Sequence, residues 1–317
     1  MIRALAALLT LALLGACAAT PGPAAPPPYT DLSQAFVEFY DRTEGLDDAA
    51  RVAAFKDEVA VLYPGFYSAR GRRTDAQHDQ LILANIERFP EIREKYMAAQ
   101  QAFPAAYARA IAHFRQFFPD STASVPTYFL HSLGEMDGGT REIDGTAVMI
   151  FGADGIAQYH TPETLGPFFD HELFHVEHGR YFPECEPVWC SLWIEGLATA
   201  AAEQMNPGID PRALMLETPR PIASTVDPNW SLALCTVSQL ADSTSQNDYK
   251  LLFYGNGGND TFAPRWGYYV GWKLARRALE RHELRELAHM PPKQAEPLVR
   301  ATLAAMIAET EGCPTGE

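Results

Sequence analysis

Two histidines and a glutamate form the strongest chemical motif in the chain. His171, Glu172 and His175 follow the pattern H-E-x-x-H inside an apolar run. Residues four apart lie on one face of a helix, so both imidazoles can reach one metal ion. Glu172 would project beside that ion, where a general base can take a proton from a zinc-bound water. We therefore predict a zinc site, with a chance match on a surface helix as the alternative.

A zinc enzyme needs a third protein ligand and an open fourth position. The segment 193–203 begins about twenty positions after His175, and its apolar, Ala-rich pattern predicts a second helix. Glu195 is its carboxylate with small neighbours, and Gly196 and Ala198 would let this helix approach the first one closely. We predict Glu195 as the third ligand. The alternative is an acidic residue that stabilises the start of a helix.

These motifs together resemble a known group of enzymes. H-E-x-x-H followed by E-G-L-A at 195–198 is similar to the gluzincin zinc metallopeptidases, and most of all to bacterial families of predicted zinc-dependent proteases. The segment 265–271 resembles the R-x-G-Y-x-x-G stretch that follows the E-G-L-A helix in those families. The resemblance covers roughly residues 120 to 280. It implies a zincin-like peptidase with Zn²⁺ as cofactor and a peptide or protein as substrate.

The same resemblance implies roles for residues outside the zinc ligands. It places one tyrosine beside the metal as a donor to the oxyanion, with Tyr268 the first candidate and Tyr269 the second. Arg265 would bind a substrate carboxylate. Independently of the resemblance, His178 lies three positions after His175 on a similar helix face, so we expect it to line the cleft. The alternatives are packing at a helix start for the tyrosines, a surface charge for Arg265 and an ordinary surface histidine for His178.

One position departs from the thermolysin branch of the gluzincins. Members of that branch carry an Asp four residues after the glutamate ligand, where it holds a ligand histidine. Here that position is Thr199. The ligand histidines must then be oriented by a hydroxyl, a backbone carbonyl or another residue.

The first 30 residues predict export and anchoring. Residues 1–16 have a basic start and an apolar run too short to span a bilayer, as in a signal peptide. The sequence Leu-Gly-Ala-Cys at 14–17 resembles the bacterial lipobox, which implies lipidation of Cys17. An ordinary secretory signal, cleaved near Ala16 or Ala19, is the alternative. Residues 17–30 are rich in Pro and Ala and predict an extended tether.

These features predict a lipid-anchored protein of the bacterial cell envelope that faces the periplasm. Ala18 stands where an Asp would imply retention in the inner membrane, by resemblance to enteric sorting, so the outer membrane is favoured. The chain has 40 acidic against 25 basic residues and a net charge of −15. Such a balance argues against a nucleic-acid partner.

The rest of the chain predicts a mainly helical α+β fold. Residues 31–120 show helical periodicity, with Pro90 and Pro104 expected to break a long helix over 75–118. Two β-rich runs at 125–130 and 146–151 predict a small antiparallel sheet before the metal helix, at the start of a metallopeptidase region over 121–317. By resemblance to gluzincins, the second run is the edge strand that pairs with the substrate backbone.

Four further cysteines bear on the compartment. Cys185 and Cys190 lie five apart in a Pro-containing loop between the two ligand helices, which outside the cytoplasm predicts a disulfide. A cysteine metal site would be expected to show C-x-x-C spacing. Cys235 and Cys313 could form a second bridge, but the sequence does not give their separation.

The function predicted from these residues is a zinc-dependent metallopeptidase anchored to the envelope. Two alternatives remain open: a zinc-binding envelope lipoprotein without peptidase activity, and a metallohydrolase acting on cell-wall amide bonds. Glu172 argues against the first, because a purely structural zinc site has no use for a base.

Overall fold

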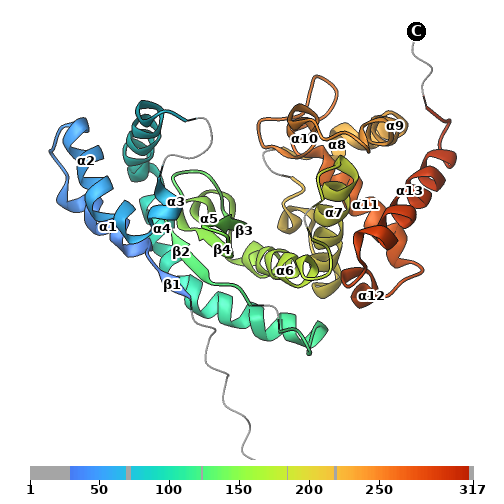
Figure 1. Cartoon of the computed structure of the whole chain (residues 1–317), viewed down its shortest axis with the longest axis horizontal. Coiled ribbons are helices and arrows are strands. Elements are labelled where there is room, and N and C mark those ends of the chain that lie inside the picture. Colours follow the sequence, from blue (N-terminus) through green and yellow to red (C-terminus); the bar gives the residue numbers. More distant parts are fainter. Residues whose placement is uncertain (1–28, 69–72, 123, 184, 218–219, 314–317) are drawn as a thin grey trace, which may run out of the picture.

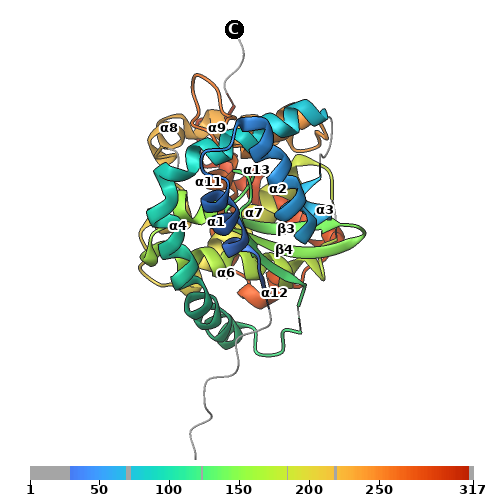
Figure 2. The same ribbon diagram turned by 90° about the vertical axis from the view of Figure 1, so that its left-hand side faces the viewer.

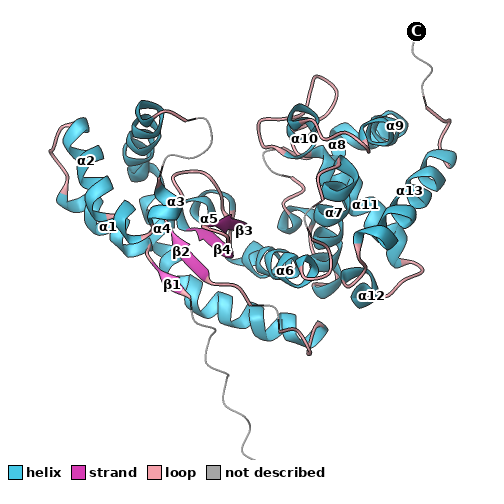
Figure 3. Cartoon of the chain, viewed as in Figure 1, coloured by secondary structure: helices cyan, strands magenta, loops and turns pink. Residues whose placement is uncertain are grey.

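The protein is a mainly helical α+β fold with one small sheet, as the sequence predicted (Figures 1 and 3). A computed structural model describes residues 29–68, 73–122, 124–183, 185–217 and 220–313. The predicted signal peptide, Cys17 and most of the tether lie outside these residues. No helix in the described ranges is long and apolar enough to cross a membrane.

One long helix dominates the N-terminal half. The short elements α1 (Ser33–Arg42), α2 (Asp48–Glu58), η1 (Ala60–Leu62) and α3 (Pro64–Tyr67) precede α4 (Asp75–Phe117). Thr74 and Gln77 form a capping box at the start of α4. Pro90 and Pro104 lie inside α4 and do not end it, contrary to prediction. The helix instead changes direction along its length (Figure 2), and prolines are a common cause of such bends.

The sheet is mixed, so the prediction of an antiparallel sheet is wrong. The strands β1 (Thr30–Asp31), β2 (Thr127–Leu130), β3 (Gly138–Ile143) and β4 (Thr146–Gly152) lie in the order β1-β2-β4-β3. β4 pairs antiparallel with β3 but parallel with β2, which also runs parallel to β1. The sequence analysis missed β3, whose Gly138 and Gly139 disfavour strands. Because β3 lies between β2 and β4 along the chain, the chain reverses direction twice, and β2 and β4 run parallel to each other.

The edge of the sheet is β3. β4 has a neighbour on each side and is buried from Val148 to Gly152, so the prediction that residues 146–151 form an edge strand is also wrong. β3 turns back from β4 through Asp144 and Gly145, which both have positive φ. Its outer side is free of any strand among the described residues.

Helices make up the C-terminal half. Helix α6 carries the H-E-x-x-H motif, and α7 carries Glu195. The helix expected from Trp266 to about His289 is divided in two by a turn. In chain order the elements are α5 (Ala153–Tyr159), α6 (Pro162–Gly179), α7 (Val188–Met205), η2 (Pro211–Leu214), α8 (Ala223–Val226), η3 (Asp227–Asn229), α9 (Trp230–Leu240), α10 (Gln246–Phe253), α11 (Trp266–Leu279), α12 (Leu284–Ala288) and α13 (Pro292–Ala308).

Two hydrophobic cores meet at α6. The first packs α1, α2 and α4 against the sheet, and the second packs α7, α9, α11 and α13 together. Phe169 of α6 is fully buried in the first core and Phe174 in the second, while Leu173 contacts both. Figure 1 shows α6 between the two groups of helices. The motif helix is therefore fixed from two sides.

The backbones of α7 and α11 touch. A Cβ atom on Gly196 would lie 2.2 Å from the carbonyl carbon of Gly271, and one on Gly271 would lie 2.4 Å from the Leu192 oxygen. Only glycine fits at such a crossing. The small residue at 196 was predicted to bring α7 close to the motif helix, but the structure shows that it brings α7 close to α11.

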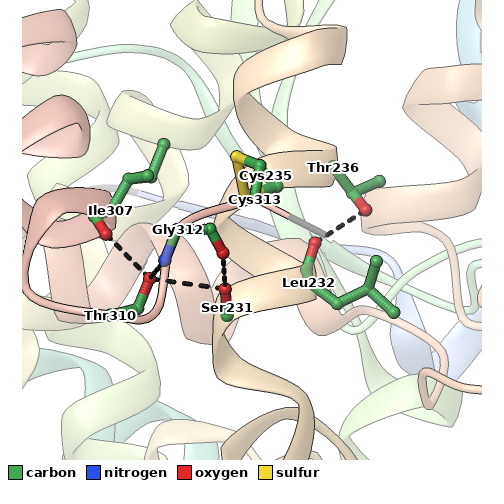
Figure 4. The surroundings of a disulfide bond; sticks show 8 residues. All are labelled: Ser231, Leu232, Cys235, Thr236, Ile307, Thr310, Gly312 and Cys313. Carbon is green, nitrogen blue, oxygen red and sulfur yellow. Dashed lines mark hydrogen bonds between the residues drawn. A yellow bond between two sulfur atoms is a disulfide. The ribbon is translucent and has the colours of Figure 1, made fainter. Parts of the chain in front are cut away.

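Two disulfides are formed. The predicted Cys185–Cys190 bond is present, with a Cα separation of 5.8 Å, and ties the loop after α6 to the first turn of α7. Cys235 of α9 pairs with Cys313, 5.5 Å away between Cα atoms. Around the second bond, Ser231 donates to the Gly312 carbonyl and Thr310 donates to the Ile307 carbonyl (Figure 4). The C-terminal segment is thus fastened to α9.

Gly196→Ala is predicted to destabilise the fold. The added methyl group must push α7 and α11 apart, and overpacking of this kind typically costs about 1–3 kcal/mol. Gly179→Ala in α6 is the matched control, because no atom lies within 4 Å of its Cβ position. Denaturant unfolding followed by circular dichroism should show a lower midpoint for Gly196→Ala alone. Equal midpoints for both variants would contradict the close contact.

Candidate metal centre and its cleft

Helix α6 aims two imidazoles at one point. It begins after Thr161, which forms a capping box with Thr164. The phenylalanines on its apolar sides fix its rotation, so His171 and His175 face away from the cores. Their Nε2 atoms lie 2.9 Å apart, and their side chains are 18% and 16% exposed. The i, i+4 spacing thus produces the predicted juxtaposition.

Glu195 of α7 completes the cluster. Its Oε2 atom lies 3.5 Å from Nε2 of His171 and 3.4 Å from Nε2 of His175. Within the described residues, these three form the only group of His, Cys, Asp or Glu whose ligand atoms converge closely enough to hold a metal ion. Glu203, the other carboxylate of α7, instead accepts a hydrogen bond from Trp272 and pairs with Arg276.

The cluster fits a zinc ion. Tetrahedral zinc with bonds of about 2.0–2.1 Å places its ligand atoms about 3.3–3.4 Å from one another. Both distances from Glu195 to the histidines match this value, whereas the 2.9 Å between the two Nε2 atoms is shorter, so the imidazoles would move slightly apart around a zinc ion. Two imidazoles and one carboxylate form the ligand set of a catalytic zinc site, because three protein ligands leave one position for water or substrate.

The charges of the three residues are coupled. Burial acts to raise the pKa of Glu195, but the charge of His175 and the hydrogen bonds from both histidines lower it below its ordinary value. Burial lowers the pKa of His171. For His175, burial also acts to lower the pKa, but the charge of Glu195, its hydrogen bond and the charge of Glu172 together outweigh burial and raise it. Glu195 is therefore a carboxylate, the form that can bind a cation.

Glu172 lies next to the cluster without a hydrogen-bond partner. Its side chain is buried, and its Oε2 atom contacts no donor among the described residues. Burial raises the pKa of Glu172 to about 8, with the charge of His175 opposing and that of Asp137 adding to the shift. A buried, unpaired carboxyl group is costly to a fold. A buried carboxyl group of raised pKa beside a candidate metal site is a feature that clusters at functional sites.

A cleft of about 480 Å³ opens onto the cluster. The start of β3 forms one wall, and α6, α7, η2 and α11 form the others. Most of the residues predicted for the site line it: the three ligands, Glu172, His178, Arg265 and Tyr268.

The structure distinguishes the two tyrosines. Tyr268 lines the cleft, and its pKa is well above the ordinary value because of burial and the charge of Glu195, so its hydroxyl is protonated and can donate. Tyr269 donates its hydroxyl to Asp227, 2.9 Å away and outside the cleft. Consecutive helical residues point about 100° apart. Tyr269, the second candidate for the oxyanion donor and a predicted substrate-binding residue, therefore links α11 to η3 and does not line the cleft.

Arg265 precedes α11 in a left-handed conformation, with φ 64°. It donates to the Met215 carbonyl oxygen at 3.1 Å, and its guanidinium lies 4.5 Å from the centre of the Tyr268 ring. Because it also lines the cleft, its charge faces the site that a substrate would occupy.

His178 is part of the cleft wall but is not a metal ligand. Its Nδ1 lies 2.7 Å from the Ala288 carbonyl oxygen, to which it donates, and its ring packs between Phe174 and Phe182. Burial lowers the pKa of His178 to about 4, so the ring is neutral near pH 7. It is a buried packing residue rather than an ordinary surface histidine.

Among the described residues, no second protein group holds the imidazoles of the two candidate ligand histidines in place. Thr199 donates its hydroxyl to the Glu195 backbone oxygen at 2.8 Å, so it contacts neither imidazole. Within the described ranges, neither His171 nor His175 has a protein hydrogen bond at Nδ1. The rings are held by packing and by the cluster itself.

Sequence analysis missed two acidic residues near the site. Asp170, adjacent to the motif, is fully buried and accepts hydrogen bonds from His113 of α4 and Asn206 at the end of α7. It ties α6 to its two neighbours. Asp137 lines the cleft directly before β3. Asp170 could have been noticed in the sequence, because it directly precedes His171 of the motif. Asp137 belongs to no motif, so nothing in the sequence pointed to it.

No family model matches the sequence, and no curated protein and no solved structure matches it. The likeness to gluzincins therefore rests on the motifs and on the cluster that they form.

Zinc binding is predicted to depend on the three cluster residues and not on the base. His171→Ala, His175→Ala and Glu195→Ala each remove a ligand and should lose the bound zinc, whereas Glu172→Gln should retain one zinc per chain. Metal analysis of the purified variants measures this. Full zinc occupancy in Glu195→Ala would show that Glu195 is not a ligand.

Proposed function

We propose that the protein is a zinc-dependent metallopeptidase. The observation that carries the proposal is the convergence of His171, His175 and Glu195 with Glu172 and Tyr268 at one cleft. A structural zinc site would need neither an unpaired buried carboxyl group nor a hydroxyl donor beside it. A peptide hydrolase needs both.

The start of β3 offers a place for an extended substrate. Asp137, Gly138, Gly139 and Thr140 line the cleft, and the outer edge of β3 carries backbone groups that can pair with a peptide. Gly138 lies so close to α6 that a Cβ atom there would be 2.4 Å from the Phe168 ring. This packing sets the edge strand directly against the motif helix, so a peptide paired to β3 passes the cluster.

The residues then divide the chemistry. A zinc ion held by His171, His175 and Glu195 would supply a Lewis acid and lower the pKa of water at the open position to about 7. The charge of that ion would lower the pKa of Glu172 from the value of about 8 that burial gives it, so that Glu172 is ionised, takes the proton of the attacking water and delivers it to the departing amine. The Tyr268 hydroxyl donates to the oxygen of the scissile carbonyl as negative charge develops on it. Arg265 holds a positive charge over the same cleft.

The proposed location is the bacterial envelope, with a lipid anchor at Cys17. Two disulfides favour an oxidising compartment outside the cytoplasm. Cys17 itself lies outside the described residues. The structural support for this location is therefore the disulfides alone.

Peptide hydrolysis is tested with the zinc-loaded protein and a library of unrelated peptides, analysed by mass spectrometry. The wild type should cleave a subset of the library, and Glu172→Gln, which keeps the metal but lacks the base, should cleave none at a measurable rate. A wild type that carries zinc but cleaves no peptide would contradict the proposal.

Tyr268→Phe is predicted to slow turnover with zinc content unchanged. The substitution removes one donor to the oxyanion, which typically costs about 100- to 1,000-fold in kcat. Because that bond strengthens as charge develops, KM should change less than kcat. Tyr269→Phe is the matched control, since its hydroxyl binds Asp227, and its kcat should stay near the wild-type value. Equal kcat values for both variants would rule out Tyr268 as the donor.

A further inference from the structure

Asp137 is a charged residue of the cleft to which the proposed mechanism gives no task. It lies directly before β3, on the wall opposite α7 and α11, and lines the same cleft as Glu172 and Arg265. Its side chain remains 28% exposed. A carboxylate in this place can touch a bound peptide.

The backbone at Asp137 is held rigidly. A Cβ atom on Gly155 would lie 2.6 Å from the Asp137 Cα, and one on Gly152 would lie 2.1 Å from the Met136 oxygen. The Asp137 carbonyl also accepts a hydrogen bond from the Gly152 amide at 2.9 Å. Two glycines of β4 and α5 thus let the chain approach so closely that Asp137 cannot shift without moving the sheet.

A buried histidine orients the carboxylate. Nε2 of His160 lies 2.9 Å from Oδ2 of Asp137, and the His160 side chain is fully buried against the Phe168 ring. Oδ1 accepts a hydrogen bond from the Gly138 amide at 3.0 Å. Burial acts to raise the pKa of Asp137, but His160 and the charge of Arg265 outweigh it and lower the pKa. A carboxylate has about four acceptor sites, and the described residues occupy two of them, so two are available to a ligand.

We propose that Asp137 is a specificity-determining residue that binds a cationic group of the peptide substrate. The inference rests on the proposed peptidase function and adds a substrate class to it. A fixed carboxylate with open acceptor sites favours an ammonium or guanidinium donor. The cation is either the free amino terminus of the peptide or the side chain of a lysine or arginine.

Arg265 is not the cation that the Asp137 carboxylate binds. The side-chain partner of Asp137 is His160, and Arg265 contacts the Met215 carbonyl and the Tyr268 ring. A competing explanation is that Asp137 only balances the charge of Arg265 or fastens β3. In that case its loss would affect charged and neutral peptides equally.

The experiment compares matched peptides built on one cleaved sequence. One pair differs in a free or acetylated amino terminus, and a second pair differs in lysine or norleucine at each position near the cleaved bond. The enzymes are the zinc-loaded wild type, Asp137→Asn and the control Glu142→Gln. Glu142 is an exposed acid on β3 that does not line the cleft.

We expect the wild type to prefer one cationic member of a pair. Asp137→Asn should lower kcat/KM for that peptide about 10- to 100-fold, mostly through KM, and leave its neutral partner within about twofold, as expected for loss of a charge-assisted hydrogen bond. Glu142→Gln should behave as the wild type. The pair that responds identifies the source of the cation. Equal losses for charged and neutral peptides would overturn the proposal.

Binding separates this inference from the peptidase proposal. If the wild type cleaves no peptide, the same pairs built on an arbitrary sequence are titrated calorimetrically into zinc-loaded Glu172→Gln, with and without Asp137→Asn. A preference for the cationic member that disappears with Asp137→Asn would support the site even though the peptidase proposal had failed. The absence of any cation preference in both proteins would overturn the inference.

Discussion

The contact between Gly196 and Gly271 is the constraint on which the site depends. It brings the backbones of α7 and α11 together, with no room for a side chain at either position. Glu195 precedes Gly196 by one residue, and Tyr268 precedes Gly271 by three, about one helical turn. One backbone contact therefore fixes the distance between the proposed metal ligand Glu195 and the proposed oxyanion donor Tyr268.

The motif helix is constrained in a different way. Phe169 belongs to one hydrophobic core and Phe174 to the other, so α6 can neither rotate nor slide without disturbing both. His171 and Glu172 lie between these two phenylalanines, and His175 follows Phe174 directly. The apolar residues of α6 thus set the rotation of the helix about its axis, and that rotation turns the polar side chains toward the cleft. The Cys185–Cys190 disulfide shortens the free path from α6 to α7.

Local spacing made the metal cluster predictable, and long-range packing limited the rest. Residues four apart on a helix meet whatever surrounds them, so His171 and His175 required only that the segment be helical. Glu195 could be placed because its helix has a clear apolar pattern. The partner of Gly196 could not be known, because a glycine shows that something approaches closely but not which element does so.

Long-range pairing also limited the prediction of the sheet. β3 contains two glycines and two charged residues, so its composition gives no strand signal, and it forms because β4 supplies a complete hydrogen-bonding partner. The prediction of β4 as the edge strand came from the resemblance to gluzincins, and without β3 nothing in the sequence marked Asp137 as part of the site. The apolar run of β4 indicates that both of its faces are buried, but such a run does not distinguish an interior strand from an edge strand.

Buried polar atoms on α6 give a reason for anchoring this helix in both hydrophobic cores. Asp170, Glu172 and His178 each keep one buried polar atom without a partner among the described residues, and all three lie on this helix. Each such atom costs about 1–3 kcal/mol relative to a satisfied one. A helix held by one core alone could relax by turning these atoms toward water, and the ligand geometry would be lost. Anchoring in two cores prevents that motion, so α6 can retain an unpaired Glu172 beside a preformed ligand cluster. A metal ion that binds this arrangement and not the unfolded chain would in turn stabilise the folded protein.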